Sequence, residues 1–202
     1  MKIFGSTDLE YLFLTGSYYR NSIYKNKFVY GSWVGVDNFY RALLKYGSFD
    51  EYHFFVASNK NKKILEDEIS RMHISSKKIK IILIKYLAYF LKKTKYSIFF
   101  TSSPNLSPLA IFRSKYAKEY FPICGIAFET ISYPNVLRQA IFNNLVSDLQ
   151  PFDSIICASS AVNSAIRNLN KLVSGSFQKQ RGFKLRYNGR LDYLPLGIYA
   201  AD

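Results

Sequence analysis

Short apolar runs alternate with segments of helical period along most of this sequence, and that alternation limits the folds open to it. Apolar runs that predict strands lie at residues 11–14, 52–57, 80–84, 97–100, 123–128 and 153–158. Apolar residues spaced three or four apart predict helices at residues 36–46, 62–72, 109–120, 136–149 and 161–172. Strands that alternate with helices form parallel sheets covered on both faces. The sequence therefore predicts an α/β fold with a mainly parallel sheet of six or seven strands.

The last part of the chain departs from this alternation. Residues 183–187 and 190–194 flank the dipeptide Asn188-Gly189, which is a strong signal for a two-residue turn. We therefore expect a β-hairpin near the C-terminal end. No Gly-, Pro- or Ser-rich linker divides the interior, and 202 residues suit one domain, so residues 1–202 are interpreted as a single domain.

The charge of the chain is high and unevenly distributed. It holds 28 basic and 14 acidic residues, a formal net charge of +14. No acid lies between Glu68 and Glu119, whereas that stretch contains eleven bases: Arg71, Lys77, Lys78, Lys80, Lys85, Lys92, Lys93, Lys95, Arg113, Lys115 and Lys118. Such asymmetry favours an anionic partner, namely nucleic acid, an anionic bilayer or a phosphate-bearing substrate. The alternative is a solvated basic face without a partner.

Residues 80–95, KIILIKYLAYFLKKTK, combine apolar residues at helical spacing with a high content of lysine. Leu83, Leu87, Phe90 and Leu91 recur at helical spacing among lysines. A basic amphipathic helix of this kind can lie on an anionic membrane surface. The alternative, which we favour, is an ordinary helix that packs its apolar face on its own sheet.

Several classes of protein are excluded or disfavoured by what the sequence lacks. It contains no run of about 18 apolar residues, and its first residues do not form a secretion signal. It contains no P-loop, no GxGxxG and no GxSxG motif. Cys124 and Cys157 lie in apolar runs and are expected to be buried thiols, while His53 and His73 offer little material for a metal site or a triad. A cytoplasmic location is expected.

Four stretches carry a resemblance to a known family. They are GSWVGVDNFYRALLKY at 31–46, FPICGIAFETISYPNVLRQAIFNNLVSDLQPFD at 121–153, SIICASSAVNSAIRNL at 154–169 and YLPLGI at 193–198. In this order they resemble the N-terminal half of a GT-B glycosyltransferase, close to family 4 of the retaining enzymes. The resemblance covers roughly residues 10 to 200 and is carried mainly by the IICASSAV unit together with PLGI.

The resemblance implies a Rossmann-like, acceptor-side half of a two-domain enzyme. Such an enzyme moves a sugar from a nucleotide-sugar donor to a glycan or lipid-linked acceptor, and its second domain holds most of the nucleotide site. That donor-binding domain would be missing from these 202 residues. The chain would then be part of a longer protein, a truncated product or the partner of a separate polypeptide, and it is expected to be inactive alone. No metal or cofactor is expected, because the nucleotide sugar is a substrate.

Candidate site residues follow from the same stretches. The glycine loop before the helix would approach the donor phosphates, and a residue at the end of the strand 123–128 would contact the transferred sugar. Relatives often carry a histidine at that strand end, and this chain carries Glu129 instead, which is otherwise an exposed or capping carboxylate. The expected catalytic residue is Glu129, the expected phosphate loop is Gly31, Ser32 and Gly35, and the expected acceptor-binding residues are Ser132, Tyr133, Arg20 and Asn21. The last two lie in a long loop at 15–32 rich in Tyr, Asn and Lys, which is otherwise a plain polar loop.

Two other functions stay open. The basic charge and the interleaved aromatic residues would also suit a nucleic-acid-binding α/β module. Against it, no RNP, KH or helix-turn-helix signature occurs in the sequence. A non-catalytic pseudo-enzyme subunit that keeps the fold is the third hypothesis. The expected location is cytoplasmic, with a peripheral position on the inner face of the membrane as a further hypothesis.

Overall fold

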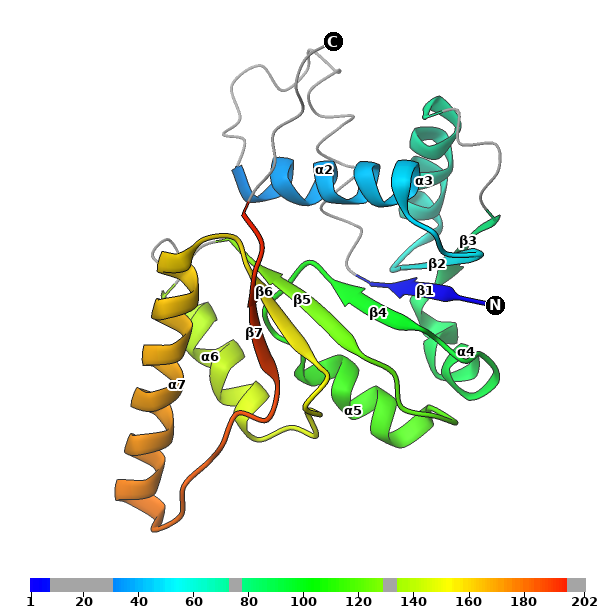
Figure 1. Ribbon diagram of the computed structural model, residues 1–202. Helices are drawn as coiled ribbons and strands as arrows, with labels where there is room; N and C mark the ends of the chain where they lie inside the picture. The colour runs from blue at the N-terminus through cyan, green and yellow to red at the C-terminus, as the bar shows by residue number, and fades with distance from the viewer. Residues whose placement is uncertain (8–30, 73–77, 129–133, 196–202) are drawn as a thin grey trace.

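The domain is built around one seven-stranded sheet in which every strand runs parallel to its neighbours (Figure 1). The computed structural model describes residues 1–7, 31–72, 78–128 and 134–195. The strands follow the order β3-β2-β1-β4-β5-β6-β7. Their bounds are β1 Ile3–Ser6, β2 Glu51–Val56, β3 Lys78–Leu83, β4 Ile98–Thr101, β5 Ile123–Ala127, β6 Ser154–Cys157 and β7 Arg190–Tyr193. The predicted α/β fold, with a parallel Rossmann-like sheet, is confirmed.

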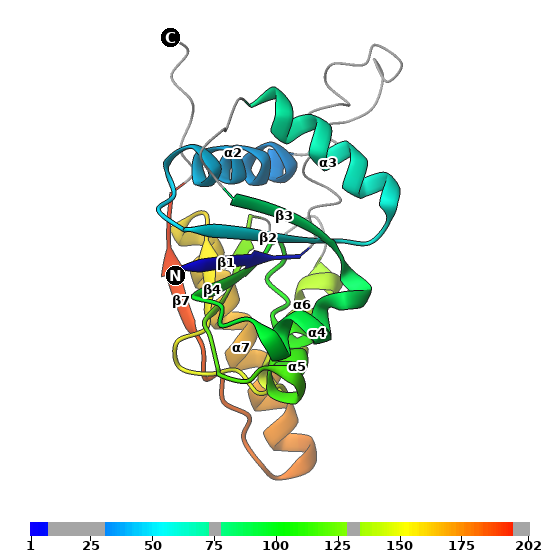
Figure 2. The ribbon, with the colours of Figure 1, turned by 90° about the vertical axis from the view of Figure 1, so that its right-hand side faces the viewer.

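Helices cover both faces of this sheet, as the sequence predicts (Figures 1 and 2). Two of them, α2 (Gly31–Tyr46) and α3 (Asn59–Arg71), lie on one face. The other face carries α4 (Leu87–Lys93), which follows the short 3₁₀ turn η3 (Ile84–Tyr86), and then α5 (Ser107–Tyr116), α6 (Pro134–Leu145) and α7 (Ser160–Arg181). This division follows from the strand order, since right-handed crossovers that leave the centre in opposite directions place their helices on opposite faces.

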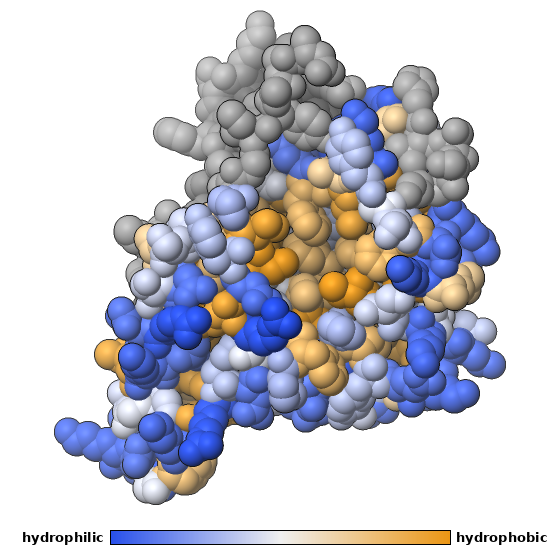
Figure 3. All heavy atoms as spheres, viewed as in Figure 1, coloured by the Kyte–Doolittle hydropathy of each residue, from blue (hydrophilic) through white to orange (hydrophobic). Residues whose placement is uncertain are grey.

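Each face has its own hydrophobic core. Beneath α2 and α3 the core is aromatic, and Phe39 of α2 stacks on Phe100 of β4 with ring centroids 4.5 Å apart. Beneath α4 to α7 the core is mostly aliphatic, and it includes Leu87, Leu91 and Ile141. The α2–α3 layer does not extend over the whole sheet, because Cys124 and Ile156 on β5 and β6 stay partly exposed on that side. Figure 3 shows apolar atoms gathered on the surface below α2.

The predicted C-terminal hairpin is wrong. Residues 183–187 form no strand, and β7 pairs in parallel with β6. The segment before β7 is held elsewhere: Ser174 on α7 donates a hydrogen bond to the Leu185 carbonyl oxygen at 2.6 Å, and Leu185 and Tyr187 pack against the core. Asn188-Gly189 therefore leads the chain to the free edge of β6, where the Arg190 amide bonds the Asp153 carbonyl oxygen at 2.7 Å.

The first strand also differs from the prediction. The sheet begins with β1 at Ile3–Ser6, which the sequence pattern did not indicate, while the predicted strand at 11–14 lies outside the described residues. The third difference is at α2, which begins at Gly31 rather than near residue 36. Gly31, Ser32 and Gly35 are therefore part of a helix and not of a loop before it.

Candidate functional site

The strand order reverses between β1 and β4, and this defines the candidate site. From β1 the chain moves outward to β2 and β3, and from β4 it moves the other way to β5, β6 and β7. Open parallel sheets of this kind bind ligands outside the carboxyl ends of the strands at such a reversal, because the loops there diverge to opposite faces. We call the ends of β1 and β4, with Ser6, Thr7, Thr101 and Ser103, the switch-point edge.

Hydroxyl groups fix the end of β1 at this edge. The Ser6 hydroxyl shares a hydrogen bond with the Tyr40 hydroxyl of α2 and lies 3.1 Å from the Phe100 carbonyl oxygen of β4. The Thr7 amide donates to the same carbonyl oxygen at 3.2 Å. Ser6 and Thr7 are both buried, so these bonds are shielded from water. They hold β1, β4 and α2 in one fixed arrangement at the edge.

The loop after β4 is held as firmly. The Ser103 amide donates to the Thr101 hydroxyl oxygen at 3.3 Å, and the Asn105 amide donates to the Ser103 hydroxyl oxygen at 3.1 Å. Such side-chain-to-backbone bonds form a tight polar turn. The side-chain oxygen of Asn105 is buried and has no hydrogen-bond partner among the described residues. The loop thus presents an acceptor that a ligand donor could satisfy.

Asn144 of α6 anchors this loop from below. Its side-chain oxygen accepts bonds from the amides of Leu106 at 2.9 Å and Ser107 at 3.1 Å, and its side-chain nitrogen donates to the Pro104 carbonyl oxygen at 2.8 Å. Asn144 is 1% exposed. The Asn144 side chain therefore caps the start of α5, where the first backbone amides of a helix have no partner within the helix. The same side chain positions the loop after β4.

The N-terminal end of α2 lies at the carboxyl edge of the sheet, because the C-terminal end of α2 leads to the amino end of β2. Tyr40 is level with the end of β1, and a helix rises about 1.5 Å per residue, so Gly31 lies about 13 Å further along the axis. The unpaired amides at a helix start belong to its first four residues. Residues 31–34 can offer them to an anion, whereas the Gly35 amide lies in the second turn and is used by the helix itself. Gly35 thus stands inside the helix and not in a loop, and the phosphate-binding role expected for it stays a prediction.

The other expected site residues are not placed. Arg20, Asn21, Glu129, Ser132 and Tyr133 all lie outside the described residues. Phe128 is described and follows the last residue of β5, and Glu129 is the next residue in the sequence. The convergence of Glu129 with Gly31 and Gly35 stays a prediction.

A buried charged cluster occupies the opposite, amino edge of the sheet. The Glu51 carboxylate bonds His53 Nε2 at 2.6 Å and pairs with Lys78 at 3.1 Å and with Lys80, while His53 Nδ1 bonds the Tyr96 hydroxyl at 2.8 Å. Burial alone would raise the pKa of Glu51, but the bonds from Lys80, His53 and Lys78 lower it to about 2. Burial lowers the pKa of His53 in spite of Glu51. His53 is 2% exposed and therefore lies in the interior of the domain.

A second buried ion pair lies at the amino ends of β5 and β6. Both guanidinium nitrogens of Arg113 bond the two carboxylate oxygens of Asp153, at 2.6 and 2.7 Å, and both side chains are fully buried. Asp153 also accepts the Ile123 amide at 2.8 Å. Because the two charges pair with each other inside the protein, we assign this pair to the fold and not to a ligand, although Arg113 Nε has no hydrogen-bond partner among the described residues.

The two cysteines are free thiols. Cys157 is fully buried and Cys124 is partly buried, close to the prediction of two buried thiols. Burial raises the pKa of Cys124 to about 11 and also raises that of Cys157, so both are poor nucleophiles. Within the described ranges, no three His, Cys, Asp or Glu side chains gather closely enough to hold a metal ion.

The sequence did not single out the switch-point residues. Ser6, Thr7 and Thr101 are hydroxyl residues at the ends of short strands, and Ser103-Pro104-Asn105 has only the composition of a turn. The available signal was the position of each hydroxyl directly after an apolar run, which becomes informative only when the strand order is known.

No protein-family model, curated protein or solved structure matches this chain. Among the helices that the structure describes, none is long and apolar enough to cross a membrane. The geometry of the switch-point edge and the resemblance in the sequence are therefore the grounds for assigning a function.

Proposed function

We propose that this domain is the acceptor-side half of a GT-B glycosyltransferase, which transfers a sugar from a nucleotide-sugar donor to a glycan or lipid-linked acceptor. The observation that carries the proposal is where the resembling residues lie. IICASSAV spans β6, the cap residue Ser159 and the first turn of α7, and the YLP of YLPLGI falls on β7 and the residues after it. The most specific stretches of the resemblance thus form consecutive units of a Rossmann-like sheet.

The switch-point edge would contribute to this activity by binding and orientation. The amides of residues 31–34 at the start of α2 suit the negative charge of a diphosphate, and the Asn105 oxygen suits a sugar hydroxyl. A fixed loop matters here because orientation of the acceptor hydroxyl lowers the activation barrier. Glu129 would act as acid or base at the end of β5.

The first test uses the 202-residue chain alone. Since the family resemblance assigns most nucleotide contacts to a second domain, we expect no sugar transfer and only weak binding of UDP or GDP. Isothermal titration calorimetry with nucleotides and nucleotide sugars measures this directly. A micromolar or tighter dissociation constant for a nucleotide or nucleotide sugar would overturn the assignment of most nucleotide contacts to a second domain.

The second test uses the enzyme completed by its donor domain. Replacing Glu129 with Gln keeps the size and removes the charge, so the transfer rate should fall by about 10²–10⁴-fold if the carboxylate assists catalysis. Glu119→Gln is the matched control, because Glu119 is exposed and its carboxylate pairs with Lys95. Unchanged turnover in Glu129→Gln would reduce Glu129 to a capping residue, and no turnover in any completed enzyme would favour the pseudo-enzyme hypothesis.

A further inference from the structure

Ten of the eleven bases in the acid-free stretch fall into two groups in the structure, and the eleventh, Lys77, lies outside the described residues. Five of them pair with acids from other parts of the chain: Arg71 with Glu68, Lys78 and Lys80 with Glu51, Lys95 with Glu119, and Arg113 with Asp153. Five more form no ion pair with any described residue, and all of these are exposed: Lys85, Lys92, Lys93, Lys115 and Lys118. Folding therefore neutralises one group and leaves the other as net positive surface.

The unpaired lysines gather on one surface, formed by η3, α4 and α5. The two helices lie side by side: the Lys118 amide reaches the Leu91 carbonyl oxygen at 3.4 Å. The ammonium groups of Lys92 and Lys115 approach the same Tyr116 ring, at 5.5 and 5.3 Å. Lys85 belongs to η3, four residues before Tyr89 of α4, and both side chains are exposed. We call this the α4–α5 surface.

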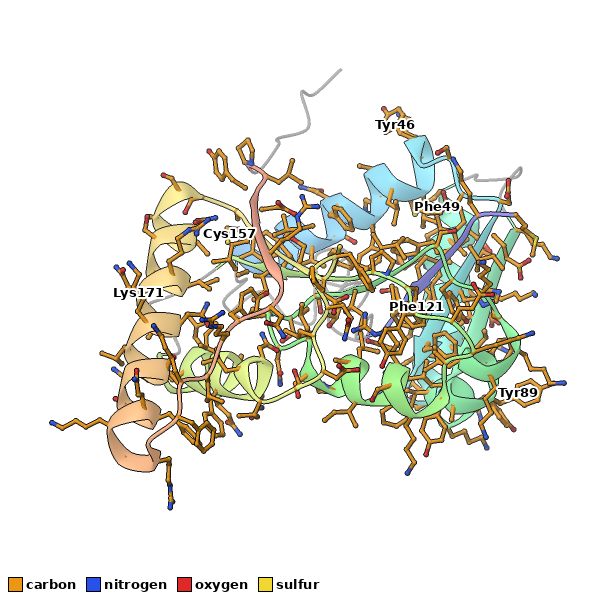
Figure 4. The ribbon with its side chains drawn as sticks, turned by 60° about the horizontal axis from the view of Figure 1, so that its bottom comes forward. Tyr46, Phe49, Tyr89, Phe121, Cys157 and Lys171 are labelled. Atoms are coloured by element: carbon orange, nitrogen blue, oxygen red, sulfur yellow. The ribbon has the colours of Figure 1, made fainter. Side chains whose placement is uncertain are left out.

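Large apolar and aromatic side chains stand among these lysines. The residues are Ile84, Tyr86, Tyr89, Ile111 and Phe112, each between 40 and 58% exposed. Figure 4 shows Tyr89 projecting outward from α4, while Phe121 lies in the interior. Single exposed apolar residues are normal, but five on the neighbouring elements η3, α4 and α5, which also carry the unpaired lysines, mark an interaction surface.

The apolar side of α4 is already used inside the domain. Leu87 and Leu91 are buried and Phe90 packs against the core. The structure thus confirms the favoured interpretation for Leu87, Phe90 and Leu91, which pack on the sheet, whereas Leu83 belongs to strand β3 and not to the helix. Any membrane contact has to be made by the opposite side, which carries tyrosine and lysine.

We propose that the α4–α5 surface docks this domain on an anionic phospholipid bilayer. The lysines would contact headgroup phosphates, and each basic residue near such a leaflet contributes about 1 kcal/mol. Tyrosine and phenylalanine rings suit the membrane–water interface, where one end of the side chain is apolar and the other is wet. Ile84 and Ile111 favour lipid over nucleic acid, since an aliphatic side chain gains in the interface but offers a base no ring to stack on.

This inference is independent of the sugar-transfer proposal. The α4–α5 surface lies on the face of the sheet opposite α2, so the phosphate-binding end of α2 and the bilayer contact use different sides of the molecule (Figure 1). Failure of either proposal leaves the other standing.

The test measures flotation of the full chain with vesicles of phosphatidylcholine alone and with vesicles that also contain phosphatidylglycerol. We expect binding to the anionic vesicles only, and loss of binding at high salt, since the Debye length falls to about 3 Å at 1 M. The site variant is Lys92→Glu/Lys93→Glu/Lys115→Glu, which leaves out Lys95 because it already pairs with Glu119. Its affinity should fall by about 100-fold or more, given about 1 kcal/mol per lysine and 1.4 kcal/mol per tenfold.

The matched control is Lys60→Glu/Lys63→Glu/Lys171→Glu. These lysines are exposed on α3 and α7, away from the α4–α5 surface, and the change in net charge is the same (Figure 4 labels Lys171). The control should keep its affinity within about threefold, because charges further away than a Debye length are screened. Equal losses in both variants would attribute binding to total charge and overturn the proposal.

A third variant, Tyr86→Ser/Tyr89→Ser, separates interfacial contact from pure charge. It should weaken vesicle binding without changing net charge, and circular dichroism should show an unchanged fold. Unchanged binding would remove the rings from the proposal. Single-stranded RNA provides the competing outcome: tight RNA binding that the lysine variant abolishes, together with no vesicle binding, would assign the surface to nucleic acid.

Discussion

Buried charges and buried hydroxyls occupy opposite edges of this sheet. Glu51 and Asp153 lie at the amino ends of strands, where neighbouring bases satisfy them completely. Ser6 and Thr101 lie at the carboxyl ends of the two central strands. Fully paired charges stabilise a fold without being available to a ligand, whereas the hydroxyls at the carboxyl ends fix the strands and loops that border the candidate site. At the residue scale, the amino edge is therefore structural and the carboxyl edge is the candidate site.

The Glu51 cluster makes the stability of the domain depend on pH. Folding lowers the pKa of Glu51 from 4.5 to about 2, so its contribution is present above pH 4.5 and is lost as the pH falls toward 2. The loss should amount to at most about 3 kcal/mol. Urea unfolding across this pH window measures it. In Glu51→Gln the domain should be less stable at neutral pH and its stability should vary less with acid. Burial also lowers the pKa of His53, so His53 adds its own loss of stability only below pH 6.5. A Glu51→Gln variant whose stability falls as steeply with acid as that of the wild type would contradict the assignment to Glu51.

A substitution at Gly125 can test how tightly the loop after β4 is packed. A Cβ atom there would lie less than 3.0 Å from the Ser103 carbonyl oxygen and from Leu106 Cδ2. Gly125→Ala should therefore cost about 1–3 kcal/mol of unfolding free energy, because the loop must move. Gly175→Ala is the control, since nothing lies within 4 Å of its Cβ and it stands inside α7, where alanine should add about 0.5–1 kcal/mol. Denaturant titrations of both variants decide, and equal effects would show that the loop is not tightly packed.

At the scale of elements, α7 shows how one side chain sets a helix boundary. Ser159 and Ser160 both stand at the start of this helix, and serine is a preferred cap residue. In the structure the Ser159 hydroxyl oxygen accepts the Val162 amide at 3.1 Å, and Ser160 is the first residue of the helix. The helix continues for 22 residues, past the predicted end at 172, until Gly182 takes a left-handed conformation with φ of 81°. Glycine adopts that conformation without a steric penalty, which explains why the helix ends there.

This boundary gives a paired prediction. Ser159→Ala removes the cap and should lower the free energy of unfolding by about 1 kcal/mol, because the Val162 amide loses its acceptor. Ser160→Ala leaves the cap intact and should change the stability by less than about 0.5 kcal/mol. Thermal or urea unfolding of the two single variants is sufficient. A larger loss in Ser160→Ala than in Ser159→Ala would reverse the assignment of the cap.

At the scale of the whole molecule, the sheet separates surfaces of different character. The α2–α3 side covers an aromatic core and leaves part of β5 and β6 exposed, while the α4–α7 side carries the unpaired lysines of the α4–α5 surface. The carboxyl edge, with the switch-point residues, lies between these two sides. A domain docked through α4 and α5 would keep that edge and the α2 side open to substrates.

The sequence by itself determined most of the elements. Short apolar runs and apolar residues at helical spacing are local patterns, readable within about ten residues. They predicted six of the seven strands at or close to their observed positions, and helices on both faces of the sheet. In α6, three leucine and isoleucine residues at helical spacing are all buried: Leu137, Ile141 and Leu145. The catalytic and acceptor-binding residues expected from the resemblance lie outside the described residues and stay predictions.

Only the tertiary structure decided which segments pair. The strand Ile3–Ser6 is four residues long and contains a glycine, so its strand state depends on its pairing with both β2 and β4. Asn188-Gly189 has the local chemistry of a hairpin, yet the free edge of β6 and the anchor at Ser174 place β7 in parallel instead. Ion pairs are also decided by the tertiary structure. Lys80 and Lys92 both lie in the acid-free stretch, and only folding brings Lys80 next to Glu51. Local patterns specify elements because their interactions span few residues, whereas strand partners and ion pairs depend on contacts between segments far apart in the chain.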